Sequence, residues 1–594
     1  MTPSGAATPI ERRRAHLDRL ANERWDVLVV GGGVTGAGAA LDAASRGLSV
    51  ALVERSDIAA GTSSRSSRLI HGGLRYLEQF RFGLVREALA ERSRLLRLAP
   101  HLVRLEPLLF PLYGNVLARP FYGSGLTLYD LLGAARDGGR HRHLSRADAV
   151  ASTPALRRSG LRGAFVFHDA VEDDARFALA VARTAQAHGA VVLTRVRVAG
   201  AVHDGGRIAG AHARDELGGA DLEVRAKAVI DATGVWSGRT DGAFPTQRTT
   251  DRDASDASRD TARDSARHAA HVIRPSRGTH LVVRRERIPS ATGLTIRVPG
   301  KVVFLVPWPG HWLIGTTDVP YDGVPDGVVP TSDDVDEILV AVNRTLDVDL
   351  TRGDLVGAYA GLRPLVADGS VSDGFSGNES TLRVSREHRV RIEPDGLARI
   401  GGGKYTTYRV MAADVVDAAL DAAFGAGTAR ARPSRTAELP LVGAASPAEL
   451  ERLTDVIAPG LEARGLERRH ANRLVARHGS QAAEVVTLGE QLDLLRPIGV
   501  EPGQTSEHLE AEVVWAAREE LAGGLDDMLA RRTRLAQEMS DRAAAVAPRV
   551  ASLLGQELGW DAARQLNEVA RFLDGARRQF DVPSTPSARP GSSS

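Results

Sequence analysis

The clearest pattern in the chain is a short β-branched run followed by a glycine-rich turn and a stretch of small residues. Residues 27–30 (Val-Leu-Val-Val) are typical of a strand buried on both faces, and residues 37–44 are small and favour a helix. A second apolar run ends at Glu54. This order predicts a strand, a turn, a helix and a second strand, which is a βαβ unit over residues 26–54.

Three later segments indicate strands that return to the same sheet from distant parts of the chain. They are residues 190–198, 228–232 and 398–401. The domain built on the βαβ unit is therefore predicted to be discontinuous.

Other segments predict two further domains. Residues 280–283, 301–307 and 312–315 alternate in the manner of strands, which indicates a mainly antiparallel sheet that could form a roof over the first domain. After residues 430–434, leucine and alanine recur at three- and four-residue spacing as far as Phe580, which predicts a separate helical domain.

Two segments lack such a pattern. Residues 237–271 carry mixed charge, small side chains and almost nothing to bury, so we expect a disordered insert. Residues 581–594 are rich in serine and proline and predict a flexible tail.

Composition narrows the classes of function. The 594 residues contain 76 basic and 74 acidic side chains, so the net charge gives no argument for a nucleic-acid partner. The absence of cysteine excludes disulfides, thiolate nucleophiles and Cys-ligated iron–sulfur clusters. Redox chemistry would therefore need a bound organic cofactor. The sequence predicts no metal site. Residues 1–24 do not resemble a secretory signal, and no apolar run approaches the ~20 residues of a membrane span. A cytoplasmic protein is expected, with attachment to a membrane surface left open.

The glycine turn predicts a dinucleotide site. Gly31 permits the tight turn, Gly33 lets the backbone approach a pyrophosphate, and Gly36 allows close helix–strand packing. Glu54, at the end of the second strand, is placed to accept hydrogen bonds from ribose hydroxyls. The loop alone does not separate FAD from NAD. A second run, residues 61–78, adds hydroxyls and glycines that suit a dinucleotide that stays bound, which favours FAD.

The motifs resemble those of the aerobic, FAD-dependent glycerol-3-phosphate dehydrogenases. The segments that carry the resemblance are residues 26–54, 66–78 (with His-Gly-Gly-Leu-Arg-Tyr), 314–319, 361–365, 401–409 and 525–534. The resemblance implies a fold like that of D-amino-acid oxidase: an α/β, Rossmann-like, discontinuous FAD-binding domain, an α+β antiparallel-sheet substrate cap and an all-α C-terminal domain. It also implies oxidation of glycerol 3-phosphate to dihydroxyacetone phosphate, with FAD taking the hydride and a respiratory quinone taking the electrons.

On this basis we expect an N-terminal extension (residues 1–24), an oxidoreductase region (25–432), a helical domain (433–580) and a tail (581–594). Within the oxidoreductase region, the FAD-binding segments are 25–105, 160–236 and 385–430, and the substrate-cap segments are 106–159 and 272–384. The 237–271 insert interrupts this region.

The resemblance assigns two sets of site residues. The cofactor set is Gly31, Gly33, Gly36, Glu54, Thr62, Ser63, Ser64, Ser67, Leu69, His71, Gly72, Gly73, Val196, Gly234, Gly403, Lys404, Thr406 and Thr407. The substrate set is Arg75, Tyr76, Thr316, Thr317, Arg363, Arg386 and Lys404, with His280 and Arg363 as catalytic residues.

Physical chemistry supports these assignments unequally. Arginine and lysine suit a phosphate, but Arg386 belongs to a three-residue repeat of arginines that a solvated face would explain equally well. Thr316 and Thr317 favour hydrogen bonds to the substrate's oxygens over a plain strand end at a turn, and which of them faces a substrate is open. For the base we favour His280, because an imidazole can accept the alcohol proton near neutral pH; His71 is the competitor.

Three other functions compete with this one. A glycerol-3-phosphate oxidase would use oxygen with the same motifs. An amine or amino-acid oxidase would want a carboxylate clamp instead of several phosphate-binding cations. A flavin-binding RNA module is opposed by the balanced charge.

A quinone acceptor implies peripheral contact with the inner face of the cell membrane. The candidate segment for this contact is residues 10–20, which are rich in arginine. A homodimer is one possibility that the sequence leaves open.

Overall fold

The computed structural model describes residues 7–73, 75–78, 80–114, 118–133, 139–239, 242–244, 273–298, 301–366, 387–499 and 507–584, with only the backbone for Arg75 and Glu78. Arg386, most of the 237–271 insert and residues 585–594 of the tail lie outside these ranges.

The first sheet contains the predicted βαβ unit. Its strands are β1 (Arg24–Val30), β2 (Val50–Glu54), β7 (Val191–Thr194), β8 (Val196–Asp204), β9 (Arg207–Asp215), β10 (Asp221–Asp231), β17 (His388–Ile392) and β18 (Ala398–Gly402). The order β17-β18-β10-β1-β2-β7 is parallel from β18 to β7, and β8 and β9 extend β10 in antiparallel fashion. The prediction that strands return to this sheet from distant segments is confirmed.

Both faces of this sheet are covered, as the uninterrupted apolar run of β1 predicts. Val27 and Val29 pack in one core with the helices of one face, whereas Leu28 and Val30 pack in another core with Leu20. The helices on the two faces and at the sheet's end are α1 (Pro9–Asn22), α2 (Val34–Ser45), α7 (Asp174–Ala187), α10 (Tyr408–Phe424) and α11 (Thr428–Ala431).

The second sheet is the predicted antiparallel roof, with one parallel pairing, between β12 and β4. Its strands are β3 (Leu69–Ile70), β4 (Val103–Tyr113), β5 (Arg142–Leu144), β6 (Leu161–Glu172), β11 (Ile273–Arg284), β12 (Gly293–Val298), β13 (Lys301–Trp308), β14 (His311–Gly315), β15 (Val319–Pro320) and β16 (Leu355–Val366). The expected boundaries put residues 161–172 with the flavin-binding segments, but β6 pairs with β4 along most of its length in this sheet. The helices beside it are α3 (Arg75–Glu78), α4 (Phe82–Leu98), α5 (Ala118–Leu132), α6 (Arg146–Ser152) and α9 (Ser332–Thr345).

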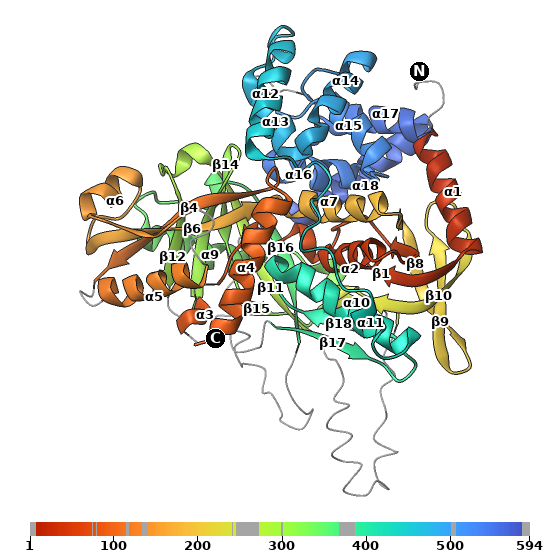
Figure 1. Ribbon diagram of the computed structural model, residues 1–594. Helices are drawn as coiled ribbons and strands as arrows, with labels where there is room; N and C mark the ends of the chain where they lie inside the picture. Colours follow the sequence, from red (N-terminus) through yellow and green to blue (C-terminus); the bar gives the residue numbers. More distant parts are fainter. Residues whose placement is uncertain are drawn as a thin grey trace, which may run out of the picture.

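The helical region lies above both sheets in Figure 1. It consists of α12 (Pro447–Glu462), α13 (Arg468–His478), α14 (Ala482–Leu492), α15 (Glu510–Glu519), a π-helical turn (Asp527–Arg532), α16 (Leu535–Glu538), α17 (Ala547–Leu558) and α18 (Ala562–Phe580). Its core is continuous with one face of the second sheet, because Val282, Val306 and Val356 pack in it. The opposite face of that sheet packs on α9 through Leu281 and Ile338.

The structure corrects two expectations about the unpatterned segments. The prediction of disorder is wrong for residues 242–244, because Phe244 is buried against the first sheet and its carbonyl accepts a hydrogen bond of 2.7 Å from Arg399. The tail is also anchored where it begins, since the Pro583 carbonyl accepts a hydrogen bond of 2.7 Å from Arg352.

Helix α1, the candidate for membrane contact, packs on the first sheet for part of its length. Leu17 and Leu20 pack against that sheet, and Arg13 donates to the Thr194 carbonyl at 2.7 Å and pairs with Asp215 at 2.5 Å. Ile10, at the start of the helix, is 50% exposed, so only the second half of the apolar face is covered by protein.

Candidate active site

A cavity of about 1050 Å³ lies between the two sheets and contains most of the predicted site residues. The cofactor candidates that line it are Gly31, Gly33, Glu54, Thr62, Ser63, Ser67, Leu69, His71, Gly73, Val196, Gly234, Gly403, Lys404 and Thr406. The substrate candidates that line it are Tyr76, His280, Thr316, Thr317, Arg363 and Lys404. Gly36, Ser64, Gly72 and Thr407 are not part of its lining.

The β1–α2 turn forms one end of the cavity and requires glycine at two positions. Gly31 has φ +109°, and a Cβ there would lie 2.7 Å from the Ala232 carbonyl oxygen. A Cβ at Gly36 would lie 1.9 Å from the Gly31 carbonyl oxygen. The turn therefore brings the N-terminus of α2 into the cavity wall, where its N–H groups favour a phosphate.

Glu54 is held by backbone amides at the same end. Its carboxylate accepts hydrogen bonds from the Gly32 N–H at 2.7 Å and the Ser56 N–H at 2.8 Å. Burial raises the pKa of Glu54, against the opposing effect of these two bonds. The carboxylate is thus oriented towards the cavity by its own backbone neighbours.

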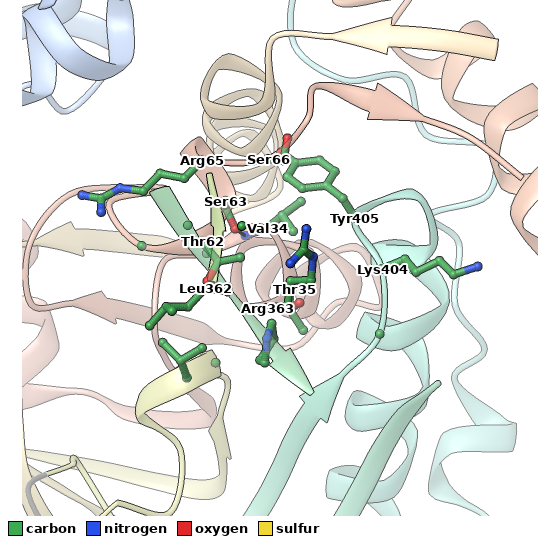
Figure 2. A pocket seen from close by; sticks show the side chains of 18 of the residues that line it. Val34, Thr35, Thr62, Ser63, Arg65, Ser66, Leu362, Arg363, Lys404 and Tyr405 are labelled. Carbon is green, nitrogen blue, oxygen red and sulfur yellow. Dashed lines mark hydrogen bonds between the residues drawn. The ribbon is translucent and has the colours of Figure 1, made fainter. Parts of the chain in front are cut away.

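A loop of residues 61–73, the flavin loop, crosses from the first sheet to the roof. Ser63 Oγ accepts a hydrogen bond of 3.0 Å from the Val34 N–H at the start of α2. The Thr62 hydroxyl donates to the Leu362 carbonyl of the roof at 2.7 Å. Figure 2 shows Thr62, Ser63, Val34 and Thr35 grouped between Arg65 on one side and Lys404 on the other.

The roof above this loop is a row of residues that pair directly across neighbouring strands. The row runs Thr295, Phe304, Gly315, His280 and Tyr359, on β12, β13, β14, β11 and β16. Since paired residues share a face, all five side-chain positions lie on one side of the sheet. The imidazole of His280 stacks on the ring of Tyr359, with centroids 4.9 Å apart and planes 14° apart.

His280, the predicted base, is a buried imidazole of the cavity wall that contacts the flavin loop. It is 3% exposed, and its Nε2 lies 2.8 Å from Ser67 Oγ of the flavin loop. Burial, and then the nearby cations Arg363 and Arg68, lower the pKa of His280 to about 3. The imidazole is therefore neutral near pH 7, the state that a base requires.

Arg363 lies two strands from Gly315 on the same roof. Its guanidinium donates to Thr316 Oγ1 at 3.2 Å and to the Thr317 carbonyl at 3.1 Å, and it pairs with Asp318 at 3.3 Å. Thr317 Oγ1 instead accepts a hydrogen bond of 3.0 Å from the Thr279 N–H. Thr316 is thus the threonine whose hydroxyl is grouped with the cation, whereas both threonines line the cavity.

Lys404 approaches from the first sheet, after β18. Its Nζ lies 3.9 Å from the centre of the Tyr76 ring. The neighbouring glycine turn is fixed by α5, because the Tyr129 hydroxyl accepts a hydrogen bond of 2.8 Å from the Gly72 N–H and donates to Asp169 at 2.7 Å. Two cations from different domains, Arg363 and Lys404, therefore line the cavity together with His280.

Comparisons with known proteins identify the family. The FAD-dependent oxidoreductase family model matches residues 26–388, and the model of the C-terminal domain of alpha-glycerophosphate oxidase matches residues 434–565. The glycerol-3-phosphate dehydrogenase of Mycobacterium leprae is 42% identical to this chain over 584 residues, which cover 98% of this chain and 92% of that protein. The chain belongs to the FAD-dependent glycerol-3-phosphate dehydrogenase family.

Other members of the family agree with this placement. The human mitochondrial glycerol-3-phosphate dehydrogenase is 38% identical, with 94% of this chain and 75% of that protein covered. The crystal structure of the glycerol-3-phosphate dehydrogenase from Bacillus halodurans, complexed with FAD, has a TM-score of 0.73 at 25% identity and covers 96% of this chain and 98% of that one.

The residues of this chain fit the FAD of the family. The glycine cradle at Gly31 and Gly36, the N-terminus of α2 in the cavity wall and the carboxylate of Glu54 are the features that a dinucleotide needs at its phosphates and ribose. FAD is the cofactor, and the cavity that begins at these residues continues without interruption to His280 and Lys404.

Several residues around this family site were missed by the sequence. Tyr359, which stacks on His280, lies four residues before Arg363 on β16, and the two-residue period of a strand could have placed both on one face. Ser66 and Asp174 form a bond described below, and nothing in their local sequence signals it.

Proposed function

We propose that this protein oxidises sn-glycerol 3-phosphate to dihydroxyacetone phosphate and passes the electrons to a quinone. The observation that carries the proposal is the presence of Arg363 and Lys404 in the same cavity as the neutral imidazole of His280. The names of its relatives support the same substrate and favour a dehydrogenase over an oxidase.

The two cations bind the phosphate in this proposal. The planar fork of Arg363 suits two phosphate oxygens, and Lys404 supplies a compact positive charge. Thr316 Oγ1, already 3.2 Å from the guanidinium, and the hydroxyl of Tyr76 then contact the remaining oxygens of the substrate. Arg75 belongs to the same substrate set by its place in the His-Gly-Gly-Leu-Arg-Tyr motif, and Arg386 remains a weaker candidate.

His280 accepts the proton of the C2 hydroxyl at Nε2, beside Ser67 Oγ. Bound FAD supplies the acceptor for the hydride that leaves C2 in the same oxidation. A phosphate dianion near Arg363 offsets one of the charges that lower the pKa of His280, so the imidazole becomes a stronger base when substrate is bound.

Anaerobic reduction of the bound flavin tests this function. Glycerol 3-phosphate should bleach the flavin absorbance, and a water-soluble quinone should restore it faster than oxygen does. Arg363→Lys and Lys404→Met should raise KM far more than they lower the amount of bound FAD. Bleaching by glycine or a D-amino acid, but not by glycerol 3-phosphate, would refute the substrate, and peroxide formed at the rate of turnover would refute the quinone acceptor.

A lipid-soluble acceptor implies a membrane-facing surface, which we place on α3, α4 and α5. None of the helices in the described part of the chain is long and apolar enough to cross a bilayer. These three helices contact one another, and lie together at the lower left of Figure 1. Three exposed apolar side chains mark this surface: Phe80 (79% exposed), Phe121 (61%) and Leu131 (71%).

Two further observations favour lipid as the occupant of this surface. The exposed residues Arg81, Arg86 and Arg119 lie on or beside the same helices and would attract anionic headgroups. Tyr122, next to Phe121, lines the flavin cavity. The head group of a quinone that leaves the bilayer at this surface would therefore be close to the cofactor.

Flotation with anionic vesicles tests the surface. Phe80→Ser combined with Phe121→Ser should weaken vesicle binding and slow reoxidation by a long-chain quinone, while reduction by substrate is unchanged. Leu566→Ser is the matched control, since Leu566 is 72% exposed on α18. Equal vesicle binding by both variants would refute this assignment.

A further inference from the structure

The helical region contacts the flavin loop directly, through three arginine-centred bonds. Arg65 of the loop donates to Gln579 on α18 at 2.6 Å, and Arg68 donates to Gln537 on α16. Arg534, between the π-helical turn and α16, donates to the Ser64 carbonyl at 3.2 Å. The loop that lines the cavity is thus held from above by the C-terminal region.

Arg534 is the most constrained of these residues. Its side chain is fully buried, and its backbone has φ +68° in the left-handed region, which a side chain other than glycine adopts only at a cost. Its guanidinium donates to Asp173 at 2.8 Å and also to Asp174. Burial opposes the charge of Arg534, but the carboxylates of Asp173 and Asp174 outweigh burial and raise its pKa.

From Asp174 the contacts continue to the roof. The second oxygen of this carboxylate accepts hydrogen bonds from the Ser66 N–H at 2.9 Å and the Ser66 hydroxyl at 2.8 Å. The Ser66 carbonyl accepts a hydrogen bond of 3.0 Å from the hydroxyl of Tyr359, whose ring stacks on His280. The next residue, Ser67, faces Nε2 of His280. Ser66 is therefore bonded to one group that contacts the imidazole, Tyr359, and directly precedes another, Ser67.

We propose that Arg534 is a positioning residue for the redox reaction: through Asp174 and Ser66 it holds Tyr359 and Ser67 against His280. The helical region then sets the orientation of the base over the flavin, in addition to stabilising the fold. An arginine is needed because one planar group must reach two carboxylates and a carbonyl at once, which a lysine ammonium on a flexible stem does less well. The inference rests on the proposed function insofar as His280 is the base.

The test compares Arg534→Lys with a matched control, Arg176→Lys. Arg176 is also buried at the boundary with the helical region, where it pairs with both oxygens of Glu520 at 2.7 and 2.9 Å, but it makes no bond to the flavin loop. Both variants keep the charge and lose a bidentate contact. If Arg534 positions the base, kcat per bound flavin falls about 10²-fold in Arg534→Lys with little change in KM, because a displacement of about 1 Å has effects of that size. In Arg176→Lys, kcat per bound flavin stays at the wild-type value.

A double-mutant cycle tests the route. Ser66→Ala should reproduce the loss of kcat, and Arg534→Lys should add little to it in the Ser66→Ala background, because the two residues act in series. Fully additive losses would overturn the route through Ser66. A wild-type kcat per bound flavin in Arg534→Lys, with lower thermal stability alone, would overturn the positioning role.

A measurement without substrate separates this inference from the proposed function. Burial and the nearby cations Arg363 and Arg68 lower the pKa of His280 to about 3. In Arg534→Lys the imidazole would be held less firmly and would be better hydrated. Its pKa should therefore rise from about 3 towards the ordinary value of a histidine. Titration of the histidine NMR signals of the holoenzyme, with His280→Gln to assign the signal, measures that shift. An unchanged titration refutes the inference, whereas a wild-type enzyme whose flavin is not bleached by glycerol 3-phosphate refutes only the proposed function.

Discussion

A single methyl group at Gly315 should displace the base. Gly315 lies beside His280 in the roof, and a Cβ at this position would lie 2.2 Å from His280 Cδ2 and 2.8 Å from Cγ and Nε2. Gly315 lies in β14 and does not have a positive φ. The three atoms nearest to an added Cβ all belong to His280, so Gly315→Ala acts first on the imidazole.

The size of the displacement follows from the packing. The ring must move by about 1.2 Å to reach an ordinary contact of 3.4 Å, and Tyr359, stacked 4.9 Å from it, blocks simple retreat. The 2.8 Å contact between His280 and Ser67 is then lost. A shift of this size at a group that exchanges a proton lowers kcat by about 10²-fold.

Stopped-flow reduction of the flavin by glycerol 3-phosphate measures this effect in Gly315→Ala, with thermal unfolding as a check on the fold. Gly327→Ala is the control, because a Cβ at Gly327 meets nothing within 4 Å. A reduction rate in Gly315→Ala equal to that of the control would show that the imidazole is not the base, or that its position does not matter.

Three further outcomes follow from the same structure. A Cβ at Gly278 would lie 2.6 Å from a guanidinium nitrogen of Arg363. Gly278→Ala should therefore displace this phosphate-binding group and raise KM about tenfold or more, with a smaller change in kcat. An unchanged KM in steady-state kinetics would contradict this prediction. Burial raises the pKa of Asp57, but Arg532 and Arg531 outweigh it and hold the pKa at about 2, so its ion pairs stabilise the fold above about pH 4 and are lost as the pH falls towards 2. Asp57→Asn should lower the melting temperature at pH 7 and flatten its decline in acid, and parallel curves would refute the assignment. Glu54→Gln should weaken FAD binding by about 1–3 kcal/mol, because the single amide oxygen cannot replace both acceptor oxygens of the carboxylate. Release of flavin on dilution measures this effect. Unchanged retention of FAD would count against Glu54 as the ribose site.

Local patterns in the sequence were sufficient for the parallel strands of the first sheet, but β9 and β17 were not predicted, and residues 190–198 form the end of one strand, β7, and the start of another, β8. The βαβ unit was predictable because β1 is buried on both faces, which requires an uninterrupted apolar run, and because the glycines of the turn are required by close backbone contacts. The alternation of β11, β13 and β14 indicated the antiparallel roof for a similar reason.

What the sequence could not predict depends on register and on distant partners. The roof row requires the pairing of five strands, and only that pairing places Gly315 against His280. The burial of Leu20 in α1 was also invisible, because an apolar stripe on a basic helix has the same pattern whether it faces lipid or protein. Phe244 is the only large apolar residue of residues 237–271, so no periodic pattern marked its burial.

The flavin loop connects these unpredicted features, because three different domains form bonds with residues 62–65 at its start. The flavin-binding sheet holds Ser63, the roof holds Thr62 through Leu362, and the helical region holds Arg65 through Gln579. Bonds from three domains together offset the conformational entropy that is lost when the loop is ordered. A change that loosens the packing of the helical region should therefore weaken the binding of FAD, as should a change in the glycine turn.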